Sequence, residues 1–316
     1  MTKARDLADL GNKTSLDEIN DAYDAGALSN RNLIINGGFD VWQRGTSFSN
    51  FNHAYSTDRW TLSAASSATV NKTSDTIYGN VCQITLGSTD TNFVQLVENL
   101  DGFMANKDMT LSFWVKSSTI TSSHCVAYNG SGFTHDVAYN VSGSWTKVVL
   151  NFNTGSTYTA GTSFRLYLLR SSNTTGVIEF AQVQLEVGGT ATPFERRSYG
   201  DELAKCQRYY QKFHDPSSAI SQIMLIGLSS NYTQFSWWPP VEMRVKPTVG
   251  VTDTSPYWES HPWYAVGTSL TITQVSNAHV SRYGGEIAVV GNWNPAPVRG
   301  TNYTITGEVF YWDAEL

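Results

Sequence analysis

Four carboxylates are the residues in this sequence whose chemistry could cleave a glycosidic bond. Such hydrolysis needs two carboxyl groups on opposite sides of the scissile bond. The candidates are Asp101, Glu179, Glu186 and Glu195. They are scattered along the chain, and their spacing alone pairs none with another. Glu179 and Glu186 also fall in strand-like sequence, where a solvated or ion-paired role is the common one. We therefore expect no catalytic residues and no enzyme.

The sequence contains no motif for metal binding, for a reactive thiol or for phosphate binding. The six histidines lack the spacing of metal ligands, and neither a nucleophile elbow nor a phosphate-binding loop is present. The three cysteines, Cys82, Cys125 and Cys206, fit no zinc motif and leave one over from any single disulfide. We expect all three to be reduced, buried small apolar groups. No cofactor is predicted.

Aromatic side chains suggest a different chemistry, the stacking of sugar rings on exposed ring faces. Residues 254–264 combine four aromatic residues with two prolines, so we expect a rigid loop rather than a regular strand. The candidate ligand-binding residues are Tyr257, Trp258, Trp263 and Tyr264, with Tyr128 and Tyr139 in a second segment. Trp and Tyr are also enriched at subunit interfaces, so an oligomer contact is the alternative for Trp258 and Trp263.

Other aromatic residues are expected to be structural. Trp42 and Trp60 lie in strand-rich sequence and are predicted to enter a core, with Asp58 and Arg59 paired at its rim. Pro239 and the proline after it end a strand, which places Trp237 and Trp238 at its terminus. One of these two is expected to face the core and the other a neighbouring molecule.

The elements that must position these residues are mostly strands. Only 15% of the residues are charged, while 13% are aromatic, and Ser, Thr, Asn and Gly recur between single apolar residues. Period-two alternation places Leu111, Phe113 and Val115 on one face of a strand, and separates Phe164, Leu166 and Leu168 from Arg165, Tyr167 and Leu169. The strands expected before residue 195 are 32–36, 80–86, 110–116, 145–152, 163–169 and 177–187.

Two helices are expected. Ser15 and Glu18 form a capping box for a short helix over 16–25. Leu203, Cys206, Tyr210 and Phe213 follow a helical period, which predicts a helix over 199–213. The β-rich sequence after it is expected to form strands over 220–228, 234–238, 248–253, 269–275, 286–290 and 303–311.

The predicted fold class is mainly β, a jelly-roll sandwich followed by a second, smaller β domain. Residues 1–31 would form a helical attachment or oligomerisation leader and residues 32–195 the jelly roll. Residues 196–214 would be the connecting helix and 215–316 the C-terminal β domain. At 316 residues the chain is long enough for two cores.

Charge and hydropathy exclude two classes of partner. The net charge is −6 and no basic stripe is present, so nucleic acid is not expected as a partner. The apolar runs are shorter than the roughly 20 residues needed to span a bilayer, so no membrane is expected either. A charged, helix-prone stretch follows Met1, and we expect no export through a signal peptide.

Three stretches carry a resemblance to a known group of proteins. Asn32-Leu-Ile-Ile-Asn-Gly-Gly-Phe-Asp40, with Val41-Trp-Gln-Arg-Gly-Thr46 and Ser56-Thr-Asp-Arg-Trp60, resembles the opening of bacteriophage tail-fibre and virion structural proteins. Gln182-Val-Gln-Leu-Glu-Val-Gly188 and the sequence from Ala191 to Tyr210 are similar to the closing strand and exit helix of that group. The segments 240–248 and 310–316 also look like phage fibre sequence. Bodies of this group resemble carbohydrate-binding jelly rolls.

The resemblance implies a non-enzymatic virion protein, a tail fibre or receptor-binding subunit that attaches the particle to glycans of the host surface. It also implies a homotrimer, joined to the phage tail or capsid through the leader. A head fibre or capsid decoration protein is the first alternative, and a polysaccharide-degrading tailspike the second. Similar carbohydrate-binding jelly rolls often hold a structural calcium through the acid after the Phe, here Asp40. The closing strand lacks the second Asp, which weakens that candidate.

Overall fold

A computed structural model describes most of the chain after residue 30. The described residues are 31–49, 54–64, 68–87, 89–98, 105–128, 133–155, 164–171, 174–212, 222–229, 231–251, 257–261, 265–266, 269–294, 302–306 and 310–315. The helix expected over 16–25 lies outside them. The chain divides into two units between Glu202 and Leu203. The mainly β fold class is confirmed, because antiparallel sheets make up both units.

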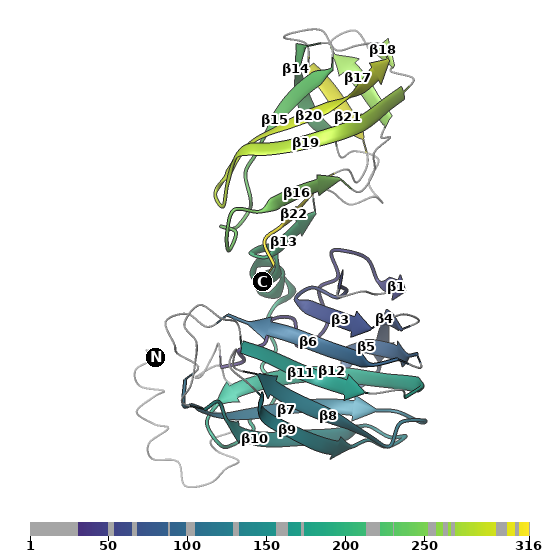
Figure 1. Ribbon diagram of the computed structural model, residues 1–316, viewed down its shortest axis with the longest axis vertical. Helices are drawn as coiled ribbons and strands as arrows, with labels where there is room; N and C mark the ends of the chain where they lie inside the picture. Colours follow the sequence, from purple (N-terminus) through teal and green to yellow (C-terminus); the bar gives the residue numbers. More distant parts are fainter. Residues whose placement is uncertain are drawn as a thin grey trace. The chain divides into compact units, whose positions relative to one another are not determined.

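The first unit is a sandwich of two six-stranded sheets (Figure 1). The first sheet has the order β1 (Ser47–Ser49), β4 (Thr69–Asp75), β5 (Gly79–Leu86), β12 (Gly176–Val187), β7 (Asp108–Lys116) and β10 (Thr146–Asn153). The second has the order β2 (Ala54–Tyr55), β3 (Trp60–Ala64), β6 (Thr91–Val97), β11 (Phe164–Ser171), β8 (Ser122–Tyr128) and β9 (Phe133–Asn140). The chain crosses repeatedly from one sheet to the other, as in a jelly roll.

Alternating apolar residues from both sheets fill the core of this sandwich. Leu111, Phe113 and Val115 of β7 are fully buried, as their period-two spacing predicts. Trp60 is also fully buried and stacks on a phenylalanine of β6, with ring centroids 4.7 Å apart. Trp42 is buried as well, so both predictions of a core tryptophan are confirmed. These contacts fix which residues the second sheet turns outward.

A β-bulge in β11 corrects one part of the predicted alternation. The register of β11 shifts between Tyr167 and Leu169 against β6. As a result Leu168 and Leu169 are both buried, whereas strict alternation places Leu169 on the outer face. The bulge resets the phase of the strand, so that Arg170 is exposed. The outward positions of β11 are therefore Arg165, Tyr167 and Arg170.

The segment 32–36 is not the strand that its apolar residues predict. Its Leu33 amide donates to the Leu185 carbonyl of β12 at 2.9 Å, but side chains accept the hydrogen bonds of three further amides. The Ile34 amide donates to Oδ1 of Asn32 at 3.0 Å, and the Ile35 amide donates to Oε1 of Gln95 at 2.9 Å. The Asn36 amide donates to Oε1 of Glu202 at 2.6 Å. These bonds satisfy the backbone without a ladder.

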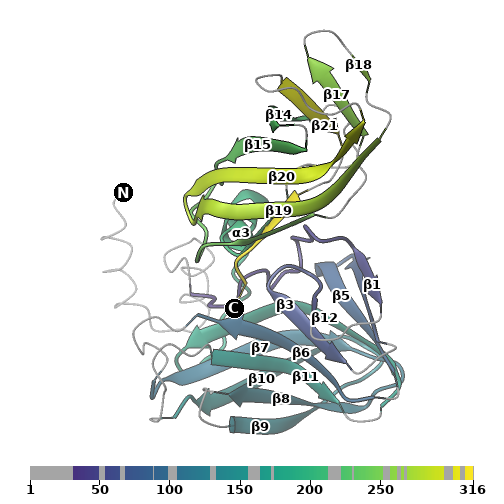
Figure 2. The same cartoon turned by 45° about the horizontal axis from the view of Figure 1, so that its top comes forward.

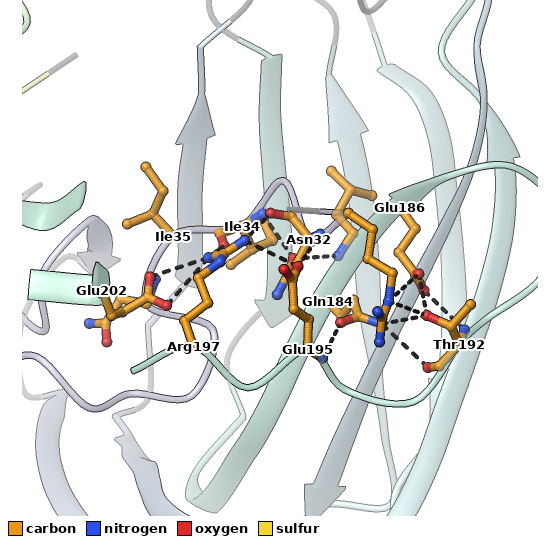
Figure 3. A network of polar contacts seen from close by, with 12 residues as sticks. Asn32, Ile34, Ile35, Gln184, Glu186, Thr192, Glu195, Arg197 and Glu202 are labelled. Atoms are coloured by element: carbon orange, nitrogen blue, oxygen red, sulfur yellow. Dashed lines mark hydrogen bonds and ion pairs between the residues drawn. The ribbon is translucent and has the colours of Figure 1, made fainter. Parts of the chain in front are cut away.

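The same segment is bound to residues 192–202 by a polar network (Figure 3). Arg197 donates to the carbonyl oxygens of Asn32 and Ile34 and forms ion pairs with Glu195 and Glu202 at 3.5 and 3.3 Å. The Asn32 amide in turn donates to Glu195 at 2.8 Å. The stretches that resemble phage fibre sequence therefore include a structural network that closes the sandwich.

The second unit contains two sheets and its own core. A three-stranded sheet has the order β13 (Tyr210–Lys212), β22 (Phe310–Asp313) and β16 (Thr248–Val251). A seven-stranded sheet has the order β18 (Ala265–Val266), β17 (Tyr257–His261), β21 (Asn302–Thr306), β14 (Gln222–Ser229), β15 (Tyr232–Trp237), β20 (Gly284–Asn294) and β19 (Ser269–Ser281). Figure 2 shows the long, curved β19 and β20 side by side.

Three predictions for the C-terminal half are wrong in detail. The helix α3 spans Tyr199–Gln207 and not 199–213, because Tyr210–Lys212 pairs with β22 instead. Residues 257–261 form a strand within the expected loop, because β21 and β18 flank them on either side. The segment 303–311 contributes to two strands, β21 and β22. In each case a partner distant in sequence decides the local structure.

The cysteines are as predicted. Cys82, Cys125 and Cys206 are free and buried. Burial raises the pKa of the Cys82 and Cys125 thiols, which keeps them in the neutral form. Among the described residues, no helix is both long and apolar enough to cross a membrane.

Candidate functional site

A groove of about 390 Å³ lies on the outer face of the second sheet of the sandwich. Its lining residues come from β2, β3, β6 and β11: Tyr55, Thr61, Ser63, Asn92, Val94, Leu96, Arg165 and Tyr167. The volume falls within the range of about 300–1,000 Å³ that is typical of small-molecule sites. The lining combines aromatic rings, hydroxyls, an amide and a guanidinium.

Strand register brings these residues together from distant parts of the chain. Tyr55 pairs with Thr61, Thr61 with Val94, and Val94 with Tyr167 across four strands. A second row, two residues along β11, joins Leu96, Arg165 and Tyr128. Their inward neighbours, such as Leu62, Phe93 and Leu166, are fully buried, so core packing turns the groove residues outward.

Two arginine guanidinium groups form cation–π contacts with tyrosine rings on this face. Arg44 lies over Tyr55 with its guanidinium carbon 5.1 Å from the ring centroid. Arg165 lies over Tyr128 at 5.4 Å. Both distances are within the roughly 6 Å of a cation–π contact. The contacts restrain the aromatic side chains, and Arg165 also lines the groove.

Thr61 supplies a polar atom that the fold leaves unused. Its Oγ1 is buried and has no hydrogen-bond partner among the described residues. A hydroxyl removed from water without a partner costs about 1–3 kcal/mol. The Thr61 side chain lines the groove, but its Oγ1 is not exposed there.

The second segment of predicted ligand-binding residues divides in two. Tyr128 is half-buried at the end of β8, in the row that includes Arg165. Tyr139 is only 5% exposed, and its hydroxyl donates to the Leu168 carbonyl at 2.9 Å. Burial also raises the pKa of Tyr139. The prediction for Tyr139 is corrected, because its ring packs edge-on against Phe113 in the core.

The second unit contains the other four predicted ligand-binding residues. Trp263 and Tyr264 lie outside the described residues. Tyr257 and Trp258 belong to β17, where only their backbone is described. Trp237 is 3% exposed and stacks on Trp312, while Trp238 is 74% exposed. The prediction that one of this pair faces the core is confirmed, and the contact of the other with a neighbour stays a prediction.

Three of the four carboxylates that the sequence singles out are paired with cations. Glu179 forms an ion pair with Lys116 at 2.8 Å, and Glu186 forms one with Arg31 at 3.4 Å. Glu195 pairs with Arg197. Asp101 lies outside the described residues. None of the three described acids lines the groove.

Asp40, the candidate calcium ligand, accepts a hydrogen bond from the Asn80 amide at 2.6 Å. It lines a small pocket of about 170 Å³, together with Glu195, Arg197 and Glu202. No cluster of three or more His, Cys, Asp or Glu side chains that could hold a metal is found in the described ranges.

Asp58 and Arg59 are buried, not paired at a rim as expected. Asp58 accepts hydrogen bonds from the backbone and side-chain amides of Gln43 at 2.6 and 2.7 Å. Burial raises the pKa of Asp58, and nearby Arg44 partly offsets this. Arg59 donates to the Leu96 carbonyl at 2.6 Å, which supports β6 beneath the groove.

Sequence reasoning missed Tyr55, Tyr167 and Arg165 as site residues. The only signal was the alternation of β11, which marks Arg165 and Tyr167 as outward-facing. Nothing local indicates that Tyr55 joins them, because that neighbourhood arises from the order of four strands.

No protein-family model matches this chain, and no curated protein matches it. Among solved structures, it is similar to the enzymatically active domain of tailspike protein 4 of bacteriophage CBA120, with 18% identity and a TM-score of 0.35. That match covers 50% of this chain and 22% of the tailspike chain, so the match spans about a fifth of the tailspike's length.

Two further matches are carbohydrate-binding modules. A family 4 module has 16% identity and a TM-score of 0.35, and the match covers 48% of this chain and 98% of the module. The CBM22-1 xylan-binding domain of Paenibacillus barcinonensis has 18% identity and a TM-score of 0.31, and the match covers 46% of this chain and 94% of the domain.

Proposed function

We propose that the groove between Tyr55 and Tyr167 binds a glycan chain and that the protein is a non-enzymatic attachment subunit. The observation that carries this proposal is the composition of one continuous lining. It places aromatic rings beside an amide, hydroxyls and a guanidinium on an outward sheet face. Sugar rings present apolar C–H faces and hydroxyl edges, and this lining offers a complement to both.

The ion pairs of Glu179, Glu186 and Glu195 favour binding over hydrolysis, because a catalytic acid or base must be available to substrate.

We place this activity in a bacteriophage particle, as a tail fibre or receptor-binding subunit that holds host surface polysaccharide. The resemblance of residues 32–60 and 182–210 to virion proteins supports this role. A homotrimer would multiply weak glycan contacts by avidity. A head fibre or capsid decoration protein would use the groove in the same way. Whether residues 1–31 bind the tail or the capsid distinguishes a tail fibre from these head proteins.

Affinity electrophoresis tests the groove. The full-length chain is run through gels that contain xylan, mixed-linkage β-glucan, polygalacturonate, alginate or hyaluronan. At least one polysaccharide should retard it, and Tyr167→Ala should weaken that retardation about tenfold. Tyr199→Ala is the matched control, because Tyr199 is 60% exposed but lies on α3 outside the groove.

Two results would change the proposal. Equal retardation of the parent and Tyr167→Ala would place any glycan site elsewhere on the chain. Release of reducing ends from a bound polysaccharide, lost on substitution of one carboxylate, would make the protein a polysaccharide-degrading tailspike. Sedimentation tests the assembly, which should have three times the 34.9 kDa mass of one chain.

A further inference from the structure

We infer that the groove selects an acidic glycan and that Arg165 binds the carboxylate of a uronic acid residue. This inference rests on the proposed glycan binding and adds the class of sugar. Its starting point is that Arg165 is the one charged residue among the described residues that line the groove.

Arg165 has no acidic partner among the described residues, unlike the exposed Arg170 and Arg282. Its guanidinium contacts the Tyr128 ring and forms no ion pair with any described residue. Arg170, on the same strand, pairs with Asp136 at 3.0 Å, and Arg282 pairs with Glu242 at 2.8 Å. No described carboxylate therefore offsets the charge of Arg165.

Two loops next to this row also lack acidic residues. Neither 129–132, which follows Tyr128, nor 156–163, which precedes β11, contains Asp or Glu, whereas Glu98 and Asp101 follow β6. These two loops therefore offer Arg165 no carboxylate. An acidic ligand would provide the charge that the protein does not.

The geometry suits a carboxylated sugar. Arg165 and Tyr167 are two residues apart on β11 and face the same side, which separates them by roughly 6.5 Å along the strand. A sugar ring stacked on Tyr167 would therefore bring a substituent within reach of the guanidinium. The contact with Tyr128 restrains the arginine while its N–H edge can bind a carboxylate in a fork.

The experiment compares each acidic polysaccharide with its own neutral form. Polygalacturonate, alginate and hyaluronan are carboxyl-reduced, which converts each uronic acid into the neutral sugar and leaves the linkages intact. Binding of the full-length chain is measured by calorimetry at low and high salt. At least one acidic form should bind about tenfold more tightly than its reduced counterpart, and salt should reduce the difference.

Variants assign the effect to Arg165. Arg165→Gln should lose about tenfold in affinity for the acidic form, remove the salt dependence and leave binding of the reduced form unchanged. Arg165→Lys should be intermediate, because it keeps the charge but loses the fork. Lys147→Gln is the control, since Lys147 is exposed on β10 of the other sheet and the net charge changes equally.

The outcomes separate this inference from the proposed function. The inference is overturned if the chain binds the acidic and reduced forms with equal affinity. It is also overturned if the chain binds only the neutral polysaccharides xylan and β-glucan. Both results leave glycan binding in place. If no polysaccharide of either kind binds, both fall. Should Arg165→Gln unfold at a lower temperature and lose affinity for reduced and acidic forms alike, Arg165 is a structural partner of Tyr128, and the inference is again overturned.

Discussion

The indole rings of Trp237 and Trp312 stack with their centroids 4.6 Å apart and their planes within 6° of parallel. Trp237 ends β15 and Trp312 lies in β22, so this contact joins the two sheets of the second unit. Both side chains are buried. The pair is the aromatic centre of a core that also includes Phe235 and Phe310, whose rings are 5.0 Å apart.

Replacing Trp312 should therefore be costly. We expect Trp312→Ala to lower the free energy of unfolding by about 3–5 kcal/mol, since it removes a large buried ring and leaves a cavity. Chemical denaturation measures this change, and the exciton band of the stacked indoles in circular dichroism should disappear. The control is Trp238→Ala, which removes a ring that is 74% exposed and should cost within about 0.5 kcal/mol. Equal costs for the two variants would contradict this account.

Gly37 is a second position where packing allows one residue type. A Cβ built there would lie 2.1 Å from the Val183 carbonyl oxygen, while the Gly37 carbonyl accepts a hydrogen bond from the Val183 amide at 2.8 Å. Gly37→Ala must push the chain away from β12, and we expect a loss of about 3 kcal/mol. Thermal unfolding measures it. Gly189→Ala, with no atom within 4 Å of the added Cβ, should be near neutral, and a similar loss there would rule out a steric cause.

The sequence predicts best where one local rule decides the structure. The strands β5, β7, β10 and β12, expected from their β-branched and aromatic residues, begin and end within about two residues of the expected bounds. Residues 32–36 satisfy the same rule and are nevertheless irregular, because Gln95 and Glu202 bind their amides. Those partners lie far along the chain, and no local pattern identifies them.

The groove was beyond prediction for a related reason. Tyr128 could be named from its polar, glycine-rich surroundings, and Tyr139 looked equivalent. The two differ in the structure because Tyr139 faces Phe113 of the opposite sheet. Which face of a strand points outward depends on the sheet it joins, and the bulge in β11 alters even that locally.

Thr61→Val should raise stability without changing ligand binding. The variant keeps the shape of the side chain and removes the buried, unpartnered hydroxyl, so the free chain should gain up to about 1 kcal/mol in stability. Affinity for the bound polysaccharide should stay within about twofold of the parent, because a buried Oγ1 does not reach a ligand in the groove. Thermal unfolding and calorimetry on the same samples measure both effects. Thr61→Ser, which keeps the hydroxyl, should not gain stability. A tenfold loss of affinity in the Val variant would show that Oγ1 binds the ligand.

His135 should make stability depend on pH. Its ring stacks on Phe152 with centroids 5.2 Å apart, and its Nε2 is buried with no hydrogen-bond partner in the described part of the chain. Desolvation lowers the pKa of His135 below its ordinary 6.5, against a smaller opposing effect of Asp136. The folded state therefore favours the neutral ring, and the unfolded state binds more protons below about pH 6.5.

The sign of the effect follows directly. The stability that His135 contributes is complete above pH 6.5 and is lost as the pH falls through 6.5 toward the lowered pKa of the folded state. His135→Phe keeps the stacking on Phe152 and removes the titration, so its melting temperature should gain on that of the parent as the pH falls from 8 to 5. Thermal unfolding at intervals across this range measures the difference. A constant difference between the two proteins would show that His135 titrates alike in the folded and unfolded chains.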